Sequence, residues 1–257
     1  MIIAIDVGNT NVVIGSIDEG RIESSARITT NRSGTVYEYA LAVKSALDFN
    51  GVDFGSAEGA IISSVVPAIT DTLKSALGVI GIRKVLTVGS GLKTGLNIKI
   101  DDPAQLGSDM VVGAVAALAD IKPPMIIIDM GTATTLSAIA PDGSFLGGAI
   151  APGVVLSLDA LAGGASLLPK VPIAAPRHSI GTNTVDSMQS GAVIGAACML
   201  DGMIDKMEAE IGEPCSVVAT GGLAGVVTPL CRRKDIVLDP DLLLKGLWVI
   251  WEKNVRR

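Results

Sequence analysis

Short apolar runs alternate with helical repeats along most of the chain. Residues 2–7 and 125–128 are apolar runs of strand length, and each is followed by a tight turn and a second apolar run, which predicts two β-hairpins. Between them, apolar residues recur at helical spacing over 36–47, after a capping box formed by Thr35 and Glu38. The pattern therefore predicts an α/β protein.

The same patterns predict further elements in each half of the chain. In the first half these are a strand at 60–66, a helix over the next ten residues, a strand at 84–88 and a helix at 108–119. In the second half they are a glycine-rich turn at 147–153, a short helical stretch at 156–161, a small-residue helix at 191–207, a strand at 216–219, an apolar run at 236–238 and a helix at 241–251.

The two hairpin segments resemble each other, which indicates an internal repeat. Asp129 and Gly131 lie 123 positions after Asp6 and Gly8. Two prolines end the helical pattern that precedes the second hairpin. We therefore predict two related domains, residues 1–120 and residues 121–257.

Composition and charge exclude several classes of protein. Hydrophobic residues make up 49% of the 257 residues and charged residues 18%, so the chain is too apolar to be disordered. A net charge of -6 argues against electrostatic binding to nucleic acid or to an anionic membrane surface. No apolar stretch reaches the roughly 18 residues of a membrane span. Three widely spaced cysteines without a C-x-x-C pair argue against disulfides and favour a cytoplasmic location.

The turn after the first strand carries the strongest candidate chemistry. In Asp6-Val-Gly-Asn-Thr-Asn11 the glycine lets the backbone approach a phosphate, and Asn9 and Thr10 offer donors to its oxygens. The strand-end aspartate can hold a hydrated magnesium ion. A plain hairpin turn has the same composition, so both interpretations stay open for this segment alone. The repeat at Asp129 favours phosphate binding, because one class of ATP-dependent phosphotransferases holds the β- and γ-phosphates between two such hairpins.

A third candidate element is the strand at 216–219, which runs into Thr220-Gly221-Gly222. Without side chains, the two glycines would let an adenine and a ribose lie against the backbone. A glycine pair is more often only a turn, so this motif is informative in combination with the two hairpins.

In this combination and order, the motifs resemble those of the type III pantothenate kinases, also called the Bvg accessory factor-like family. That family lies within the superfamily of sugar kinases, heat-shock ATPases and actin. The matching segments cover nearly the whole chain: D-V-G-N-T-N at 6–11, G-S-D at 107–109, D-M-G-T-A-T at 129–134, G-A-I-A-P-G at 148–153, G-T-N-T at 181–184 and T-G-G at 220–222.

The resemblance implies a fold of two duplicated ribonuclease H-like (actin-like ATPase) domains, with mixed sheets flanked by helices and an interdomain cleft. It implies phosphorylation of the primary hydroxyl of pantothenate by ATP, giving 4'-phosphopantothenate in the first step of coenzyme A biosynthesis. It also implies Mg2+, a monovalent cation (K+ or NH4+) and a homodimer, with no nucleic acid or membrane partner. The helix at 191–207 could pack against its symmetry mate, although burial within one chain would give the same pattern.

The resemblance extends to individual residues. It implies that Asp6 holds magnesium through water and that Asp129 supports the monovalent cation and the phosphate site. The residues implied to contact ATP belong to the two hairpins and the glycine turn: Asp6, Val7, Gly8, Asn9, Thr10, Asn11, Gly131, Thr132, Gly221 and Gly222. Those implied to contact pantothenate are Ile100, Gly107, Ser108, Asp109, Met110 and, across the dimer interface, Thr184. An ordinary helix cap is the alternative for Thr184.

Asp109 is implied to be the general base that receives the proton of the attacking hydroxyl. It begins the predicted helix at 108–119, where the helix dipole is expected to keep its carboxylate ionised and weakly basic. It would then act mainly by orienting the hydroxyl and would accept the proton late. A simple helix-capping role is the alternative.

Two positions depart from the family pattern. The family has arginine where this chain has Met110, and the loss of that partner for the pantothenate carboxylate typically costs about 1.5–3 kcal/mol. The family often has tyrosine where Ile100 stands. Three interpretations follow: a weakened pantothenate kinase with compensating contacts, for example from Lys170 or Arg177; a kinase for another small alcohol; or an ATP-binding regulatory relative without turnover. We favour the first.

Overall fold

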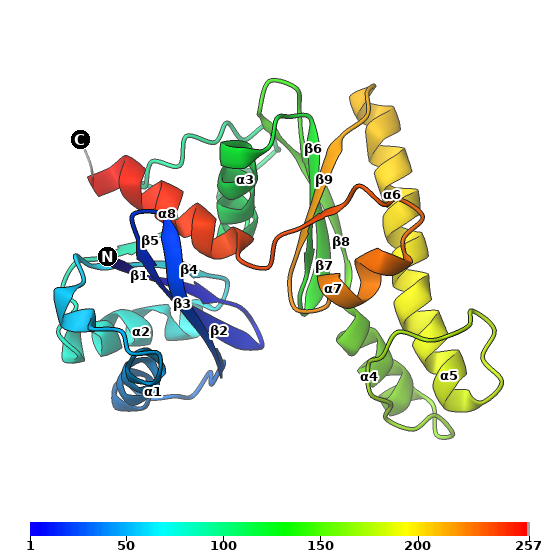
Figure 1. The fold of residues 1–257 in the computed structure, drawn as a ribbon, viewed down its shortest axis with the longest axis horizontal. Helices are drawn as coiled ribbons and strands as arrows, with labels where there is room; N and C mark the ends of the chain where they lie inside the picture. Colours follow the sequence, from blue (N-terminus) through cyan, green and yellow to red (C-terminus); the bar gives the residue numbers. More distant parts are fainter. Residues whose placement is uncertain (256–257) are drawn as a thin grey trace. The chain divides into compact units, whose positions relative to one another are not determined.

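The computed structural model describes residues 1–255, which form two compact units (Figure 1). Unit 1 comprises residues 1–96 and 101–120 and the segment from Asp241 onwards, and unit 2 comprises residues 97–100 and 121–240. The predicted division into 1–120 and 121–257 differs from these units in two segments: residues 97–100 belong to unit 2, and the segment from Asp241 belongs to unit 1.

Unit 1 contains a five-stranded mixed sheet. Its strands are β1 (Ile2–Val7), β2 (Asn11–Asp18), β3 (Arg21–Thr29), β4 (Ala60–Ser64) and β5 (Val85–Thr87), in the order β3-β2-β1-β4-β5. Its helices are α1 (Val36–Phe49), α2 (Pro67–Val79), α3 (Ser108–Asp120) and α8 (Leu242–Val255). The first two cover one face of the sheet, and α3 and α8 lie at the other (Figure 1).

The C-terminal helix joins unit 1 because glycine lets it approach α3 closely. A Cβ atom on Gly246 would lie only 2.2 Å from the carbonyl oxygen of Val112, so a larger residue does not fit there. The fully buried Trp251 packs beside Gly59 at the start of β4. These are contacts between distant parts of the chain, and the predicted boundary, drawn from local patterns, did not include them.

Unit 2 repeats the topology of unit 1. Its strands are β6 (Met125–Met130), β7 (Ala133–Ile139), β8 (Phe145–Pro152), β9 (Ser216–Thr220) and β10 (Val237–Leu238), in the order β10-β9-β6-β7-β8. Matched by their order along the chain, the strands occupy the same places as in unit 1. The duplicated mixed sheets of the predicted fold class are therefore confirmed.

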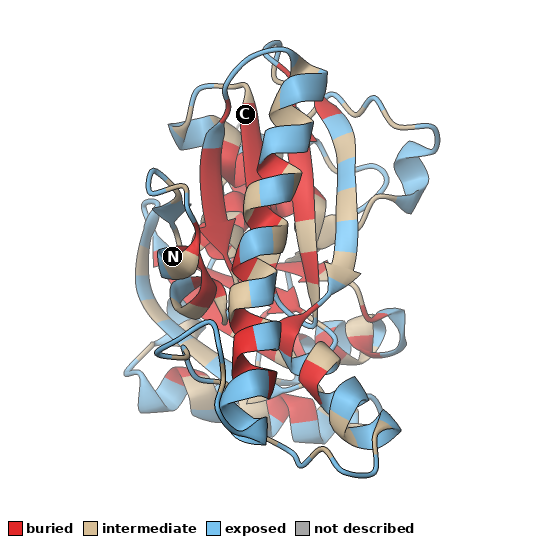
Figure 2. Ribbon diagram, turned by 90° about the vertical axis from the view of Figure 1, so that its right-hand side faces the viewer, coloured by how far each residue is buried: buried red, intermediate tan, exposed pale blue. Residues whose placement is uncertain are grey.

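The helices of unit 2 are α4 (Val154–Gly164), α5 (Thr184–Gln189), α6 (Gly195–Ile211) and the short α7 (Ala224–Val227), with a π-helical turn at Ser190–Ile194 joining α5 to α6. Short 3-10 helices occur at Phe54–Ser56, Pro103–Gln105 and Thr228–Leu230. In Figure 2 the inner strands of the sheets are mostly buried, whereas much of the long helix facing the viewer is exposed. The buried side of α6, with Ala197, Leu200 and Ile204, packs into the core of unit 2.

One prediction of local structure was wrong. The predicted turn at 147–153 lies mainly in β8, and its Gly148 is needed because a Cβ there would lie 2.0 Å from the carbonyl oxygen of Leu136. The predicted helix at 191–207 is confirmed; it begins in the π-helical turn and extends to Ile211. The capping box of α1 is confirmed, since Thr35 and Glu38 make both of its reciprocal hydrogen bonds.

Within residues 1–255, no helix is both long enough and apolar enough to cross a lipid bilayer. All three cysteines are free thiols.

Candidate functional site

The carboxyl ends of β1 and β4 carry the candidate site residues of unit 1. These neighbouring strands are parallel, with Asp6 opposite Ser63 and Val7 opposite Ser64. Asp6 is 9% exposed. The β1–β2 turn begins directly after it and is closed by a 2.9 Å hydrogen bond from the Gly8 N–H to the carbonyl oxygen of Asn11. The predicted phosphate hairpin is thus a tight turn at the carboxyl end of the central strand β1.

The chain that follows β3 supports this turn. The Thr30 hydroxyl donates to the carbonyl oxygen of Gly8 at 2.7 Å, and the Thr30 N–H donates to that of Thr10 at 2.9 Å. The Arg32 guanidinium donates to Oδ1 of Asn9 at 2.8 Å, which places a cation at the turn. Sequence reasoning missed Arg32, because no motif links it to a turn 23 positions earlier.

Among the predicted ATP contacts, Val7 is distinct. Its side chain is buried in the hydrophobic core of unit 1, and its carbonyl oxygen accepts a hydrogen bond from the Val65 N–H. Asn9 and Thr10 are exposed at the tip of the turn. The exposed side chains are therefore those of the tip, and Val7 anchors the turn in the core.

Asp109 lies in the first turn of α3, in the same unit as Asp6. Ser108 attaches this helix start to the end of β4: its hydroxyl donates to the carbonyl oxygen of Ser64 at 3.0 Å and lies 3.1 Å from the Ser63 hydroxyl. Since Ser63 is opposite Asp6 in the sheet, both aspartates lie at the carboxyl ends of β1 and β4.

The environment of Asp109 differs from the sequence-based expectation. Burial raises the pKa of its carboxyl above the usual value, and hydrogen bonds from the N–H groups of Met110 and of Asp109 itself offset only part of the rise. This direction is opposite to the weakly basic carboxylate expected from the helix dipole, because burial is the largest of the effects on this pKa.

The other predicted pantothenate contacts are divided between the units. Met110 is half-buried and adjoins Asp109 on α3, with an unbranched apolar side chain and no charge. Ile100 belongs to unit 2, where residues 97–100 run beside β8 and the Lys99 N–H donates to the carbonyl oxygen of Phe145. Its Cγ2 atom would lie 3.8 Å from a Cβ on Gly147.

The carboxyl ends of β6 and β9 form the corresponding edge in unit 2. These strands are parallel, with Asp129 opposite Thr220. The following glycine, Gly221, has a left-handed backbone (φ +94°), and a Cβ there would lie 2.6 Å from both Oδ1 of Asp129 and the backbone nitrogen of Met130. The glycine turn therefore lies directly against the strand-end carboxylate.

The β6–β7 turn completes this edge. Gly131 and Thr132 are both exposed, and the turn is one residue shorter than the β1–β2 turn. The Gly153 N–H donates to the carbonyl oxygen of Thr132 at 3.1 Å, and a Cβ on Gly153 would lie 2.4 Å from the same oxygen. The predicted G-A-I-A-P-G segment thus supports the hairpin from β8.

Thr184 lies on the surface of unit 2. It is the first residue of α5 and is exposed, while the N-cap is Asn183, whose side chain accepts from the Asp186 N–H at 2.9 Å. The alternative that Thr184 caps the helix was therefore wrong. Its side chain is accessible, which a contact with an external partner requires.

The candidate metal-binding residues are single strand-end carboxylates. Among the described residues, no three His, Cys, Asp or Glu side chains gather into a set that could hold a metal ion. A nucleotide-bound magnesium ion needs only one or two protein carboxylates besides phosphate oxygens and water. Asp6, buried at the end of β1, suits that role.

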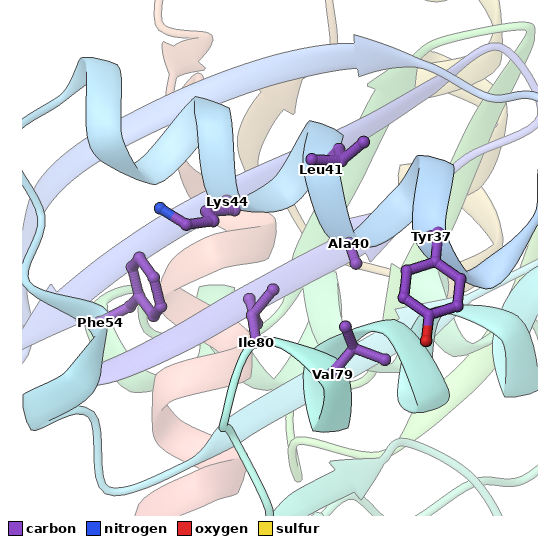
Figure 3. Close-up of a pocket in the computed structure, with 7 residues that line it drawn as sticks. All are labelled: Tyr37, Ala40, Leu41, Lys44, Phe54, Val79 and Ile80. Carbon is purple, nitrogen blue, oxygen red and sulfur yellow. The ribbon is translucent and has the colours of Figure 1, made fainter.

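An apolar groove between α1 and α2 is separate from these residues (Figure 3). Its lining is Tyr37, Ala40, Leu41, Lys44, Phe54, Val79 and Ile80. The one cation there, Lys44, is paired with Asp48 at 2.6 Å and lies 5.3 Å from the Phe54 ring centroid. None of the predicted site residues lines this groove.

Solved structures with the same fold are only distantly related in sequence. A Baf family transcriptional activator from Campylobacter jejuni matches with a TM-score of 0.61 and 16% identity, covering 97% of each chain. The activator of the 2-hydroxyisocaproyl-CoA dehydratase from Clostridium difficile, solved with bound ADPNP, matches with a TM-score of 0.53 and 12% identity, covering 98% of this chain and 94% of that one. These likenesses show the fold alone.

Sequence comparison is more specific. A family model described as type III pantothenate kinase matches residues 2–206. The type III pantothenate kinase of Geobacillus sp. (strain WCH70) is 44% identical over 256 residues, covering 99% of this chain and 98% of the relative. That of Halalkalibacterium halodurans is 42% identical over 255 residues, covering 99% and 100%. With motifs, fold and full-length similarity in agreement, this chain belongs to the type III pantothenate kinase family.

Proposed function

We propose that this chain transfers the γ-phosphoryl group of ATP to the primary hydroxyl of pantothenate, giving 4'-phosphopantothenate and ADP in the first step of coenzyme A biosynthesis. Full-length identity of 41–44% to proteins named type III pantothenate kinase supports the reaction. The structural observation that supports it most directly is that Asp6 and Asp109 lie at the same end of the sheet of unit 1. Ser63, which is opposite Asp6, and Ser108, which precedes Asp109, link the two positions.

Asp109 is the proposed general base. Phosphoryl transfer depends mainly on positioning and charge neutralisation, so the base has to orient the hydroxyl and take its proton as the new oxygen–phosphorus bond forms. The bond from the γ-phosphorus to its bridging oxygen breaks, and ADP leaves with that oxygen. Because burial raises the pKa of Asp109, its carboxylate binds the proton more strongly than an exposed aspartate does.

ATP binding is proposed for the hairpin tips and the glycine turn. In unit 1 the residues proposed to contact phosphate are Gly8, Asn9, Thr10 and Asn11, with Arg32 adding a charge beside Asn9. In unit 2 they are Gly131 and Thr132, with Gly221 and Gly222 serving the nucleoside. Magnesium, when bound, neutralises phosphate charge, and Asp6 is the carboxylate proposed to hold it through water. The ADPNP bound by the Clostridium difficile protein supports nucleotide binding on this fold.

A monovalent cation, K+ or NH4+, is proposed to act beside Asp129. This carboxylate is half-buried at the end of β6 and adjoins the Gly221 turn, where it can offer oxygen to a weakly hydrated cation. We expect turnover in potassium or ammonium chloride and much less in choline chloride of equal ionic strength. Equal rates in all three salts would contradict the proposal.

The active form is proposed to be a homodimer joined through unit 2. Several large apolar side chains there are exposed, including Ile150 (73%) on the outer strand β8, Leu167 (90%) and Ile180 (83%). A partner covering this surface would bring Thr184 or its own equivalent to a pantothenate site. Light scattering should give the mass of a dimer, and Ile150→Glu should shift it toward a monomer. A monomeric wild type would refute this assembly.

Pantothenate is the proposed acceptor despite Met110 and Ile100. The residues proposed to contact it are Gly107, Asp109, Met110, Ile100 and, across the dimer interface, Thr184. Lys170 and Arg177 are exposed and remain candidates for the carboxylate partner. We also propose a cytoplasmic location, which the three free thiols support.

The decisive test is ADP release by the full-length protein with ATP, Mg2+ and K+. The assay is run with pantothenate, without it, and with other small primary alcohols. Release that requires pantothenate is the expected result. ATP binding without pantothenate-dependent ADP would instead identify a regulatory relative, and turnover of a different alcohol alone would identify another kinase.

A further inference from the structure

The hydroxyl group of Ser108 is fully engaged by protein atoms. It donates to the carbonyl oxygen of Ser64 at 3.0 Å and accepts from the Ser64 N–H at 3.0 Å. The Ser63 hydroxyl lies 3.1 Å away. Because the one hydrogen of Ser108 goes to Ser64, the Ser63 hydroxyl is the donor in this pair. A serine hydroxyl offers one donor and two acceptor sites, so no site remains for a substrate.

This arrangement joins three elements at one point. Ser63 is fully buried in β4 and lies opposite Asp6 of β1, while Ser108 is the first residue of α3 and precedes Asp109. A shift of α3 along β4 would break all three hydrogen bonds of Ser108 together. The position of the Asp109 backbone relative to the strand that carries Asp6 therefore depends on this pair of hydroxyl groups.

We propose that Ser108 and Ser63 are positioning residues, which hold Asp109 in place for proton transfer, and that Ser108 does not bind pantothenate through its side chain. This inference rests on the proposed function of Asp109. It replaces the substrate contact that the sequence resemblance implied for Ser108 with a role inside the protein.

The test compares Ser108→Ala, Ser108→Thr and Ser63→Ala with wild type in steady-state kinetics. Thr70→Ala is the matched control, because the Thr70 hydroxyl also bonds to the end of β4, through Ser64 Oγ at 2.8 Å, but does not touch Ser108. We expect Ser108→Ala to lower kcat by roughly 10- to 100-fold, the scale of a small misplacement of a catalytic group. The KM for ATP should stay nearly unchanged, and Ser108→Thr should recover most of kcat.

Three results would overturn the inference. Unchanged kcat in Ser108→Ala would show that Asp109 does not need the hydroxyl. A raised KM for pantothenate at unchanged kcat would restore Ser108 as a substrate contact. A fall in kcat that Thr70→Ala reproduces would show only a general loss of stability.

A measurement without turnover separates this inference from the proposed function. The Asp109 carboxyl carbon is titrated by NMR in wild type and in Ser108→Ala, with Ser108→Thr as the conservative variant. A titration midpoint of Asp109 that shifts in Ser108→Ala and returns to the wild-type value in Ser108→Thr supports positioning. This result does not depend on pantothenate being the acceptor. Identical titrations in all three proteins would contradict it.

Discussion

Gly107 lies directly against the carboxylate of Asp109: a Cβ atom at position 107 would be 2.5 Å from Oδ1 of Asp109. The obstacle is the end of a side chain and not backbone, so Asp109 would have to move while the fold stays intact. The glycine of the G-S-D motif is therefore required by the side chain of the proposed base.

Gly107→Ala is expected to lower kcat with little loss of stability. The added methyl group displaces the Asp109 carboxylate, and a misplacement of this kind can cost up to about 100-fold in rate. Gly89→Ala is the control, because a Cβ there meets no atom within 4 Å. Kinetics and thermal unfolding are measured on both variants. Full activity in Gly107→Ala would show that the carboxylate position seen here is not the catalytic one.

Asp109→Asn is expected to raise the free energy of unfolding at neutral pH while lowering kcat. Burial penalises the charged carboxylate, and asparagine removes that charge at nearly constant shape. In wild type the folded pKa lies above the ordinary value of 3.8, so its stability rises as the pH falls through the folded pKa toward 3.8. The advantage of the variant should therefore shrink in acid.

Urea unfolding of wild type and Asp109→Asn at neutral and acidic pH checks this sign. If the free energy of unfolding of Asp109→Asn gains on that of wild type as the pH falls, then hydrogen bonds, and not burial, dominate the pKa of Asp109. The same carboxyl must be ionised to accept a proton, so wild-type kcat should fall on the acid side as Asp109 becomes protonated.

The repeated hairpins and α1 could be predicted because their signals are local. Asp6 and Asp129 follow apolar runs, and the capping box of α1 spans only Thr35 to Glu38. The strand β8 was predicted as a turn because the segment 147–153 is rich in glycine. Position 148 requires glycine because a Cβ there would collide with the backbone of β7, a contact that the local sequence does not reveal.

The links between distant segments could not be predicted. Ser63 and Ser108 are 45 positions apart, and Arg32 reaches Asn9 from beyond β3. The raised pKa of Asp109 likewise depends on burial, which a helix position alone does not reveal. The sequence motifs located the candidate residues, and tertiary contacts determine what each can do.

Gly221→Ala is expected to destabilise unit 2 and to weaken ATP binding. Its left-handed backbone disfavours any side chain, and a Cβ would lie within 2.7 Å of two backbone atoms of Met130. Strain of this type costs about 1–3 kcal/mol. Gly225→Ala, whose Cβ would lie 3.7 Å from Leu238, is the control. Denaturant unfolding and ATP titration measure both effects, and equal behaviour of the two variants would contradict the argument.

Met110→Arg is expected to tighten pantothenate binding and to leave ATP binding nearly unchanged. Position 110 adjoins Asp109 in the first turn of α3 and is half-buried. An arginine there could form a bidentate, charge-assisted pair with the pantothenate carboxylate. A contact of about 1.5–3 kcal/mol corresponds to roughly tenfold to hundredfold in affinity.

Met110→Leu serves as the control for the change of shape, and pantothenol, which lacks the carboxylate, serves as the control ligand. The arginine variant should improve the KM for pantothenate and not the binding of pantothenol, because the gain arises from the carboxylate alone. If the arginine variant binds pantothenate no better than wild type, the carboxylate is held elsewhere, and Lys170→Ala and Arg177→Ala become the next variants to measure. If the affinities for pantothenate and pantothenol rise equally, the arginine does not act by recognising the charge of the carboxylate.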